Sequence, residues 1–405
     1  MGLLNAAVIV AALGYFVDIY DLLLFNIVRV DSLKAIGFEG RELVFGAILH
    51  NIQMSGMLIG GIAWGVLGDK RGRLSVLFGS IFIYSVANFL NGWINTFTEY
   101  AFLRFFAGFG LAGELGAGVT LVSEILPAKS RGYGTMLVAA IGVMGAIVGG
   151  WVAQHYNWRI AYELGGVLGF GLLLLRISVS ESGVYKSMNH SGQGIRKGSF
   201  IHLFNHRERF SRYAYCILAG IPIWFTIGIL VAYAPEFGKA LKLSAPVTTA
   251  KAVMASYTGF VIGSLAGGFF SQWIKSRVYA LKLFVILNAL TSVAYLVLLN
   301  EVNASTLYEM CVLLGTTSGA CWAIIITLAA EQFGTNLRAT VATTVPNFIR
   351  FSVVPMSLVF LALKGEIGLI PAAVSISVVV SVIAFLASAQ IKESFGKDLN
   401  YVENL

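Results

Sequence analysis

The chain is a nearly unbroken succession of long apolar runs, and this feature constrains its fold more than any other. A membrane-spanning helix needs about 20 mostly apolar residues. Twelve runs meet that length, at about 5–29, 43–67, 74–95, 98–124, 132–154, 159–177, 213–234, 248–273, 279–299, 305–330, 340–363 and 367–390. The sequence therefore predicts an all-α membrane protein with twelve transmembrane helices, here called spans one to twelve.

The composition supports this prediction and narrows the possible classes of function. Only 12% of the residues are charged, against about 25% in soluble proteins. The three cysteines lie in apolar segments without disulfide or metal-site spacing, and no ATP-binding P-loop motif occurs. We expect no cofactor, no metal and no nucleic-acid partner, because a net charge of +8 also suits the basic loops of a membrane protein.

The basic residues indicate how the chain crosses the membrane. If both termini are cytoplasmic, 18 Lys and Arg residues lie on the inside and 8 on the outside, with two within spans. Cytoplasmic loops of membrane proteins are enriched in Lys and Arg. We therefore predict a multi-pass protein of the plasma (bacterial inner) membrane, monomeric and surrounded by lipid, with both termini in the cytoplasm.

One long polar interval, at about 178–212, divides the spans into six plus six. The predicted units are an N-terminal lobe (1–178), a cytoplasmic linker (179–212), a C-terminal lobe (213–391) and a tail (392–405). Apolar residues alternate with basic ones over 199–213, which predicts a short amphipathic helix on the inner leaflet.

The two halves match at a constant offset of 207 residues. Gly56 aligns with Gly263, and "TLVSE" (Thr120–Glu124) aligns with "TLAAE" (Thr327–Glu331). Two parallel six-helix repeats are typical of a transporter whose site lies between its lobes, near the middle of the bilayer.

Several motifs resemble one transporter family. They are "GVLGDKRGRLSVL" (Gly65–Leu77), "LRFFAGFGLAGELGAGVTLVSEILPAKSRG" (Leu103–Gly132), "NWR" (Asn157–Arg159) and "SESGVYK" (Ser180–Lys186). Together they resemble the major facilitator superfamily, especially its metabolite–proton symporter, sugar-porter and organic-ion branches. The resemblance implies two pseudo-symmetric six-helix lobes and transport by alternating access rather than enzymatic catalysis.

The same resemblance implies a cytoplasmic latch that closes when the transporter opens outward. Small residues allow helices to approach closely, and charged residues at the helix ends would bridge the lobes. The alternative is a set of ordinary basic anchors and solvated helix ends, where an exposed pair contributes roughly 0–1 kcal/mol. The expected latch residues are Gly65, Gly68, Asp69, Arg73, Glu124, Arg131, Glu331 and Arg338.

Two aspartates, Asp18 and Asp21, share one face of span one in an apolar setting. An ionised aspartate there costs about 2.5–3.5 kcal/mol, so it needs a counter-charge, a wet cavity or a bundle interior. At 1.5 Å per residue, Asp21 and Arg104 lie at similar depths, roughly 12 Å and 9 Å below the outer surface. The resemblance implies that this pair couples transport to protons; the alternative is a static ion pair. Because arginine stays protonated, the carboxylate would carry the proton.

Glu114 and Arg350 are further charges inside spans four and eleven. Glu114 is a candidate second proton site, partner of Asp18 or ligand for a cation, and a hydrogen-bonded packing role is the alternative. Arg350 lies between Pro346 and Pro355, which suggests a bend beside a cavity. Its planar fork suits a carboxylate or sulfonate; the alternatives are a backbone carbonyl or an acid of the other lobe.

Five more residues could line a substrate site, although each alone is also typical of helix packing. They are Trp224, Tyr257, Trp322, Asn347 and Gln53.

The leading hypothesis is a secondary active transporter that moves a small organic solute, an anion or carboxylate, with protons. A proton-coupled exporter of organic cations or drugs is the alternative within transport. A transporter-like sensor or a membrane enzyme is the alternative of another class. A sensor usually needs a long signalling tail, but only about 15 residues follow span twelve.

Overall fold

The computed structural model describes residues 6–175, 200–243, 245–298, 303–397 and 401–403. Within them, the side chains of 6, 7, 43, 73, 123, 128, 129 and 131 are outside the description. The latch candidates Arg73 and Arg131 therefore have no described side-chain geometry, and most of the predicted linker, 179–199, also lies outside the described residues.

The described residues are helical and contain no strand. The first half contains α1 (Ala6–Ala35), α2 (Glu42–Arg71), α3 (Arg73–Asn91), α4 (Phe97–Leu111), α5 (Glu114–Ile125), α6 (Ala128–His155) and α7 (Trp158–Leu175). The second half contains η2 (Phe200–Leu203), α9 (Arg207–Phe225), η3 (Thr226–Val231), α10 (Ala234–Ala240), α11 (Thr249–Trp273), α12 (Arg277–Val297), α13 (Ala304–Glu331), α14 (Arg338–Phe351), α15 (Val353–Ile367) and α16 (Leu369–Gln390).

Every predicted span coincides with one helix or with a broken pair of helices. Eleven stretches of the described chain are long and apolar enough to cross a membrane. The remaining span is α2, a helix of 30 residues whose apolar run is interrupted by His50, Asn51 and Gln53. The predicted all-α fold with twelve transmembrane helices is thus confirmed.

Three spans are interrupted near their middle. Span four breaks at Ala112 and Gly113, and glycine lowers helix propensity by about 1 kcal/mol relative to alanine. Span seven carries Pro222 and then passes into the π-helix η3; proline lacks the N–H that an α-helix uses. Span eleven breaks at Ser352, three residues before Pro355. Irregular backbone at mid-membrane is where transporters commonly place their sites.

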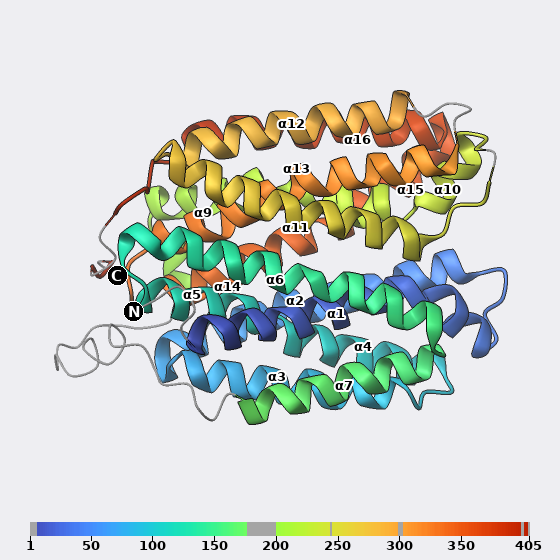
Figure 1. Cartoon of the computed structure of the whole chain (residues 1–405), viewed down its shortest axis with the longest axis horizontal. Helices are drawn as coiled ribbons and strands as arrows, with labels where there is room; N and C mark the ends of the chain where they lie inside the picture. Colours follow the sequence, from blue (N-terminus) through green and yellow to red (C-terminus); the bar gives the residue numbers. More distant parts are fainter. Residues whose placement is uncertain (1–5, 176–199, 244, 299–302, 398–400, 404–405) are drawn as a thin grey trace.

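The spans form two lobes, one from each half of the sequence (Figure 1). In the first lobe, a Cβ on Gly56 of α2 would strike the carbonyl oxygen of Phe105 in α4. In the second lobe, a Cβ on Gly263 of α11 would strike the carbonyl oxygen of Thr316 in α13. The internal repeat therefore reproduces the same close helix packing in both lobes.

A substitution at this packing site has a clear expected effect. Gly263→Val should destabilise the protein by roughly 1–3 kcal/mol, because overpacking forces the two backbones apart. Thermal unfolding in detergent, followed by tryptophan fluorescence, measures the change. Gly171→Val is the control, since nothing lies within 4 Å of a Cβ at Gly171. Equal loss of stability in both variants would contradict the close-packing account.

Both ends of the chain lie at one end of the bundle, which we call the terminal end; the opposite end is the distal end (Figure 1). At the terminal end, the C-terminal tail binds the loop before α14. The backbone N–H of Thr335 donates to the Tyr401 carbonyl at 2.8 Å, and the Glu403 N–H donates to Oδ1 of Asn336 at 2.9 Å. Arg212 forms an ion pair with Glu403 at 3.2 Å. The tail thereby fixes the start of α14.

Glu393, just after span twelve, caps the start of α12. It accepts hydrogen bonds from Ser276 Oγ at 2.5 Å and from the N–H groups of Arg277 at 2.9 Å and Val278 at 3.2 Å. Burial alone would raise the pKa of the Glu393 carboxyl, but these hydrogen bonds outweigh burial and lower its pKa below the ordinary value. The carboxylate satisfies N–H groups that a helix start leaves free.

The predicted amphipathic helix at 199–213 takes a different form in its described part. Phe200–Leu203 forms one 3₁₀ turn. The helix α9 begins at Arg207 and contains the basic residues that follow. Ile201 and Phe204 remain exposed. Ile201 and Phe204 therefore lie on a turn at the entry to span seven, whereas the exposed Phe210 lies on α9.

Candidate functional site between the lobes

The two lobes meet around a narrow gap near the middle of the spans. The gap is lined by Tyr15, Ile19, Val143, Ile223, Trp224, Ile227, Tyr257, Phe260, Trp322 and Arg350. Its free volume for water centres is about 10 Å³, which is room for about one water molecule. An organic solute therefore enters only after the lobes part.

Arg350 is the charged residue among those that line the gap. Its Nη2 lies 3.6 Å from Oδ2 of Asp18, and both side chains are buried. Neither Asp18 oxygen has a hydrogen-bond partner among the described residues, and the same holds for Nε and Nη2 of Arg350. In this conformation Arg350 thus faces an acid of the other lobe, one of the alternatives that its sequence position left open.

Hydrogen bonds hold the neighbours of Arg350 in place across the lobes. Asn347 accepts from Nη1 of Arg350 at 3.4 Å and donates to the carbonyl of Ala112, in the break of span four, at 2.9 Å. Trp322 Nε1 donates to the Tyr15 hydroxyl at 2.9 Å. The guanidinium lies 5.6 Å from the centre of the Trp322 ring. Asn347 and Trp322 therefore orient Arg350 and join the lobes.

Aromatic rings form much of the remaining wall. Tyr257 and Phe260 stack with ring centres 5.4 Å apart, and Trp224 is buried on the same gap. Gln53, also expected to line the site, is buried but is not among the residues that line this gap, and its backbone carbonyl lies where α2 packs on Gly108 of α4. Much of the wall is therefore flat apolar surface.

Glu114 starts α5 directly after the break in span four and is buried. It interacts electrostatically with Asp18, so these two acids share one buried region. Two carboxylates so placed resist being ionised together, while the start of a helix favours negative charge on Glu114.

The direct Asp21–Arg104 contact expected from their depths does not form in this conformation. Arg104 Nη2 donates to Oδ1 of Asn88 in α3 at 2.5 Å. Neither Asp21 oxygen has a hydrogen-bond partner among the described residues, although Arg104 and Asn88 both act on this carboxyl. Equal depth along two helices does not fix their rotation, and α3 supplies a polar group that neighbours both residues.

Aromatic side chains surround Arg104. Its guanidinium lies 4.9 Å from the ring centre of Tyr162 and 6.0 Å from that of Tyr100, and the two hydroxyls lie 2.7 Å apart. Gly165 leaves space for Asp21, because a Cβ there would strike the carboxylate. Cation–π contacts stabilise a buried guanidinium.

The second lobe carries no charge at the positions equivalent to these residues. At the offset of 207, Asp18, Asp21, Arg104 and Glu114 align with Phe225, Gly228, Cys311 and Cys321. The acids of this buried region therefore belong to the first lobe, and Arg350 is the cation that the second lobe adds.

Asp69, on α2 of the first lobe, contacts the start of α14 in the second lobe. Its carboxylate accepts from the Ala339 N–H at 3.1 Å, the Thr340 N–H at 2.8 Å and Thr340 Oγ1 at 2.7 Å. Gly65 and Gly68 allow this approach, since a Cβ at Gly65 would lie 2.9 Å from Thr340 Cα. A carboxylate at a helix start stabilises the N–H groups there.

A buried ion pair adds to this contact. Arg338 Nη1 lies 3.2 Å from Glu124 Oε1, with both side chains 0% exposed. Glu331 instead pairs with Arg277 of its own lobe at 3.4 Å and accepts from Ser394 Oγ at 2.8 Å. The lobes are thus joined at the terminal end, where the latch residues were expected.

We expect Glu124→Gln to weaken the contact between the two lobes at the terminal end and to expose the residues between them. Removing one member of a buried pair costs roughly 3–5 kcal/mol, whereas an exposed pair contributes about 0–1 kcal/mol. Labelling of a cysteine placed at Thr135, on a cysteine-free background, should become faster from the terminal side. Glu208→Gln is the control, because the Lys392–Glu208 pair is 73% and 59% exposed. Unchanged labelling in Glu124→Gln would contradict a latch at this pair.

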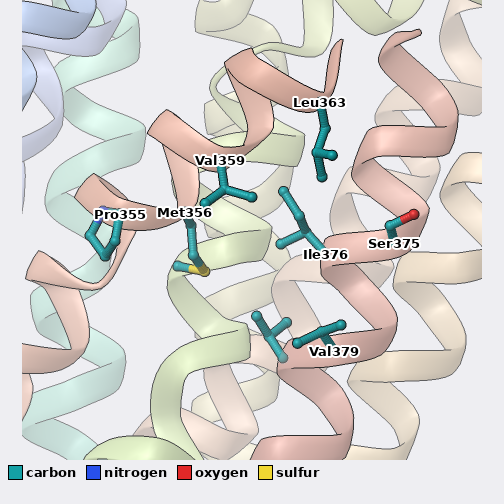
Figure 2. A pocket seen from close by; sticks show the side chains of 8 residues that line it. Pro355, Met356, Val359, Leu363, Ser375, Ile376 and Val379 are labelled. Atoms are coloured by element: carbon teal, nitrogen blue, oxygen red, sulfur yellow. The ribbon is translucent and has the colours of Figure 1, made fainter. Parts of the chain in front are cut away.

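An apolar groove between α15 and α16 lies apart from these charges. Figure 2 shows Met356, Val359, Ile376 and Val379 beside it, and Ser375 is the polar residue among those that line it. Val359 and Val379 are half exposed, so the groove opens to the lipid side. It offers no charged group to recognise a solute.

Two six-span lobes that close on a central gap define a membrane transporter, not an enzyme. The chain belongs to the Major Facilitator Superfamily, whose sequence profile matches residues 11–354. It is a multi-pass membrane protein that carries a small molecule.

Relatives and solved structures agree with this assignment. The cis,cis-muconate transport protein of Acinetobacter baylyi is 25% identical over 377 residues, which cover 90% of this chain and 89% of that protein. The gentisate transporter of Corynebacterium glutamicum is 23% identical over 353 residues, covering 83% and 76%. The structure of the proton:xylose symporter XylE, bound to 6-bromo-6-deoxy-D-glucose, has a TM-score of 0.74 at 16% identity and covers 98% of this chain and 97% of that chain. This last likeness shows the shared fold.

Proposed function

We propose that this transporter carries small conjugated or aromatic carboxylates together with protons by alternating access. The observation that carries the proposal is Arg350, buried at the gap between the lobes with Nε and Nη2 lacking hydrogen-bond partners among the described residues. A guanidinium fork binds a carboxylate through two parallel hydrogen bonds. The named substrates of two relatives, cis,cis-muconate and gentisate, are conjugated or aromatic carboxylates.

The buried acids support coupling to protons. Asp18, Asp21 and Glu114 are each at most 1% exposed, and an ionised aspartate at mid-membrane costs about 2.5–3.5 kcal/mol. A proton removes that cost when the lobes move and a counter-charge is withdrawn. In this proposal Asp21, beside Asn88 and Arg104, carries a proton through the first lobe.

The proposed location is the inner membrane of a bacterium, with the terminal end in the cytoplasm. The excess of basic residues on that side supports this orientation. The contacts of Asp69 and Glu124 then close the cytoplasmic side, and solute reaches Arg350 from the distal end. An inward proton gradient would drive uptake.

Purified protein in liposomes tests the proposal. Labelled cis,cis-muconate is a suitable probe, because its two charges keep it from crossing lipid unaided. An alkaline interior should drive its accumulation, and a protonophore should abolish it. Uptake that ignores the gradient contradicts proton coupling. Transport of organic cations but not of carboxylates would favour the alternative, an antiporter in which the buried acids bind the cation.

A further inference from the structure

Asp18 stands at Arg350 where the carboxylate of a solute would bind. We infer that Asp18 is a built-in competitor: the solute carboxylate displaces it from Arg350, and Asp18 then takes up a proton. This inference rests on the proposed function and deepens it, because it links one particular proton to the binding of the solute itself.

The ion pair between Asp18 and Arg350 is long. The two charged groups lie 3.6 Å apart and share no hydrogen bond. By contrast, both Glu403 oxygens accept from Arg212, each at 3.2 Å. A free carboxylate can align with the fork of Arg350 and gain two charge-assisted hydrogen bonds that Asp18 does not make. Exchange therefore favours a solute that fits the gap.

The position of the pair makes the exchange depend on lobe movement. Asp18 lies on α1 of the first lobe, and Arg350 lies on α14 of the second. When the lobes part to admit a solute, the distance between these side chains grows, while Asn347 keeps its contact with Arg350 within α14. Arg350 thus stays on the lobe that would receive the solute.

Once Arg350 holds a solute, Asp18 has no other cation among the described groups that act on it. An ionised Asp18 would then face acids and neutral hydroxyls in a buried site, and a proton relieves that cost. Arg104 is directed to Asn88 and Asp21 instead. The titratable groups around Asp18, besides Arg350, are Tyr15 and Asp21 on its own helix, Glu114 on α5 and Tyr257 on α11.

Charge balances in this step. Before binding, Asp18 neutralises Arg350; afterwards the solute carboxylate neutralises Arg350, and Asp18 is a neutral acid. At this pair of residues one carboxylate and one proton enter together, so the summed charge of Asp18, Arg350 and the bound carboxylate is the same when the pair is empty and when it is loaded. The exchange at Asp18 and Arg350 thus adds no net charge when the lobes move.

Gentisate binding to the purified protein in detergent tests the inference. Its carboxyl stays ionised from about pH 6 to 8, so the probe itself supplies no proton. In weak buffer with a pH indicator, the wild type should take up about one proton per gentisate bound. Linkage then requires the affinity to fall about tenfold for each unit of rising pH.

Asp18→Asn should remove both effects. This variant should take up no proton on binding, show an affinity independent of pH, and bind at least about tenfold more tightly than wild type near pH 8. Asp31→Asn is the matched control: Asp31 is an exposed acid on the same helix, and this variant should behave as wild type. Asp18→Ser provides a second neutral variant if Asp18→Asn does not fold.

The outcomes separate this inference from the proposed function. A wild type that binds gentisate without taking up a proton overturns the inference, as does an Asp18→Asn affinity no tighter than wild type. If the wild type binds neither gentisate nor cis,cis-muconate, the proposed function itself fails. Binding that requires Arg350 but ignores Asp18 leaves the proposed function standing and rejects only the exchange.

Discussion

Replacing Arg350 with glutamine should weaken carboxylate binding at least about 100-fold and abolish uptake. A hydrogen bond to a charged group contributes about 1.5–3 kcal/mol, and each 1.4 kcal/mol is about tenfold in affinity. Glutamine offers neither the positive charge nor the two-pronged donor of Arg350, which is buried at the gap. Binding of labelled cis,cis-muconate in detergent and its uptake into liposomes measure the two effects.

Two further variants sharpen this result. Arg350→Lys keeps the charge and loses the planar fork, so we expect an intermediate loss of about tenfold. Lys34→Gln removes an exposed cation near the distal end of α1 and should leave binding unchanged. If Arg350→Gln binds within about twofold of wild type, Arg350 is not the anchor for carboxylates.

The fold could be predicted because the length of an apolar run is a local property. The breaks within the spans were only partly predictable. Pro346 and Pro355 indicated a bend in span eleven, and the helix does break at Ser352. The break at Gly113 had no comparable signal, because glycines such as Gly56 and Gly60 lie inside the unbroken helix α2.

The buried charged residues of the candidate site could be named from the sequence, but their contacts could not. Charges inside spans are conspicuous, so Asp18, Asp21, Arg104 and Arg350 stood out. Their partners depend on helix rotation and on how the lobes meet. No spacing rule relates Asp18 to a residue more than 300 positions later in the other lobe.

Asn88 shows most clearly what sequence reasoning missed. It is a polar residue in the last turn of α3 and accepts a hydrogen bond from Arg104. Asn91, one turn further along, is equally polar and instead donates to the Ala87 carbonyl of its own helix. Only the packing of α3 against α4 and α7 distinguishes these two asparagines.

The two buried aspartates of α1 have different cationic neighbours, so we expect them to have different roles. Asp18 faces the cation of the other lobe, whereas Asp21 faces Arg104 of its own lobe. A change at Asp21 should therefore affect the movement of the carrier more than the capture of a solute.

Asp21→Asn should abolish accumulation driven by a pH gradient and leave solute exchange intact. Asparagine mimics the protonated acid, so the loaded carrier can still change between its inward-open and outward-open states. The empty carrier is expected to return only when an ionised Asp21 compensates Arg104, and this variant cannot provide that charge. In liposomes, uptake of cis,cis-muconate should fall to the level seen with a protonophore, while counterflow of labelled against unlabelled solute continues.

Asp31→Asn, at an exposed position of the same helix, is the control and should keep both activities. Loss of both activities in Asp21→Asn would mean that the Asp21, Asn88 and Arg104 cluster only holds the first lobe together. Retention of gradient-driven uptake would mean that Asp21 carries no coupling proton, and that the proton taken up by Asp18 when the solute binds Arg350 is sufficient for coupling.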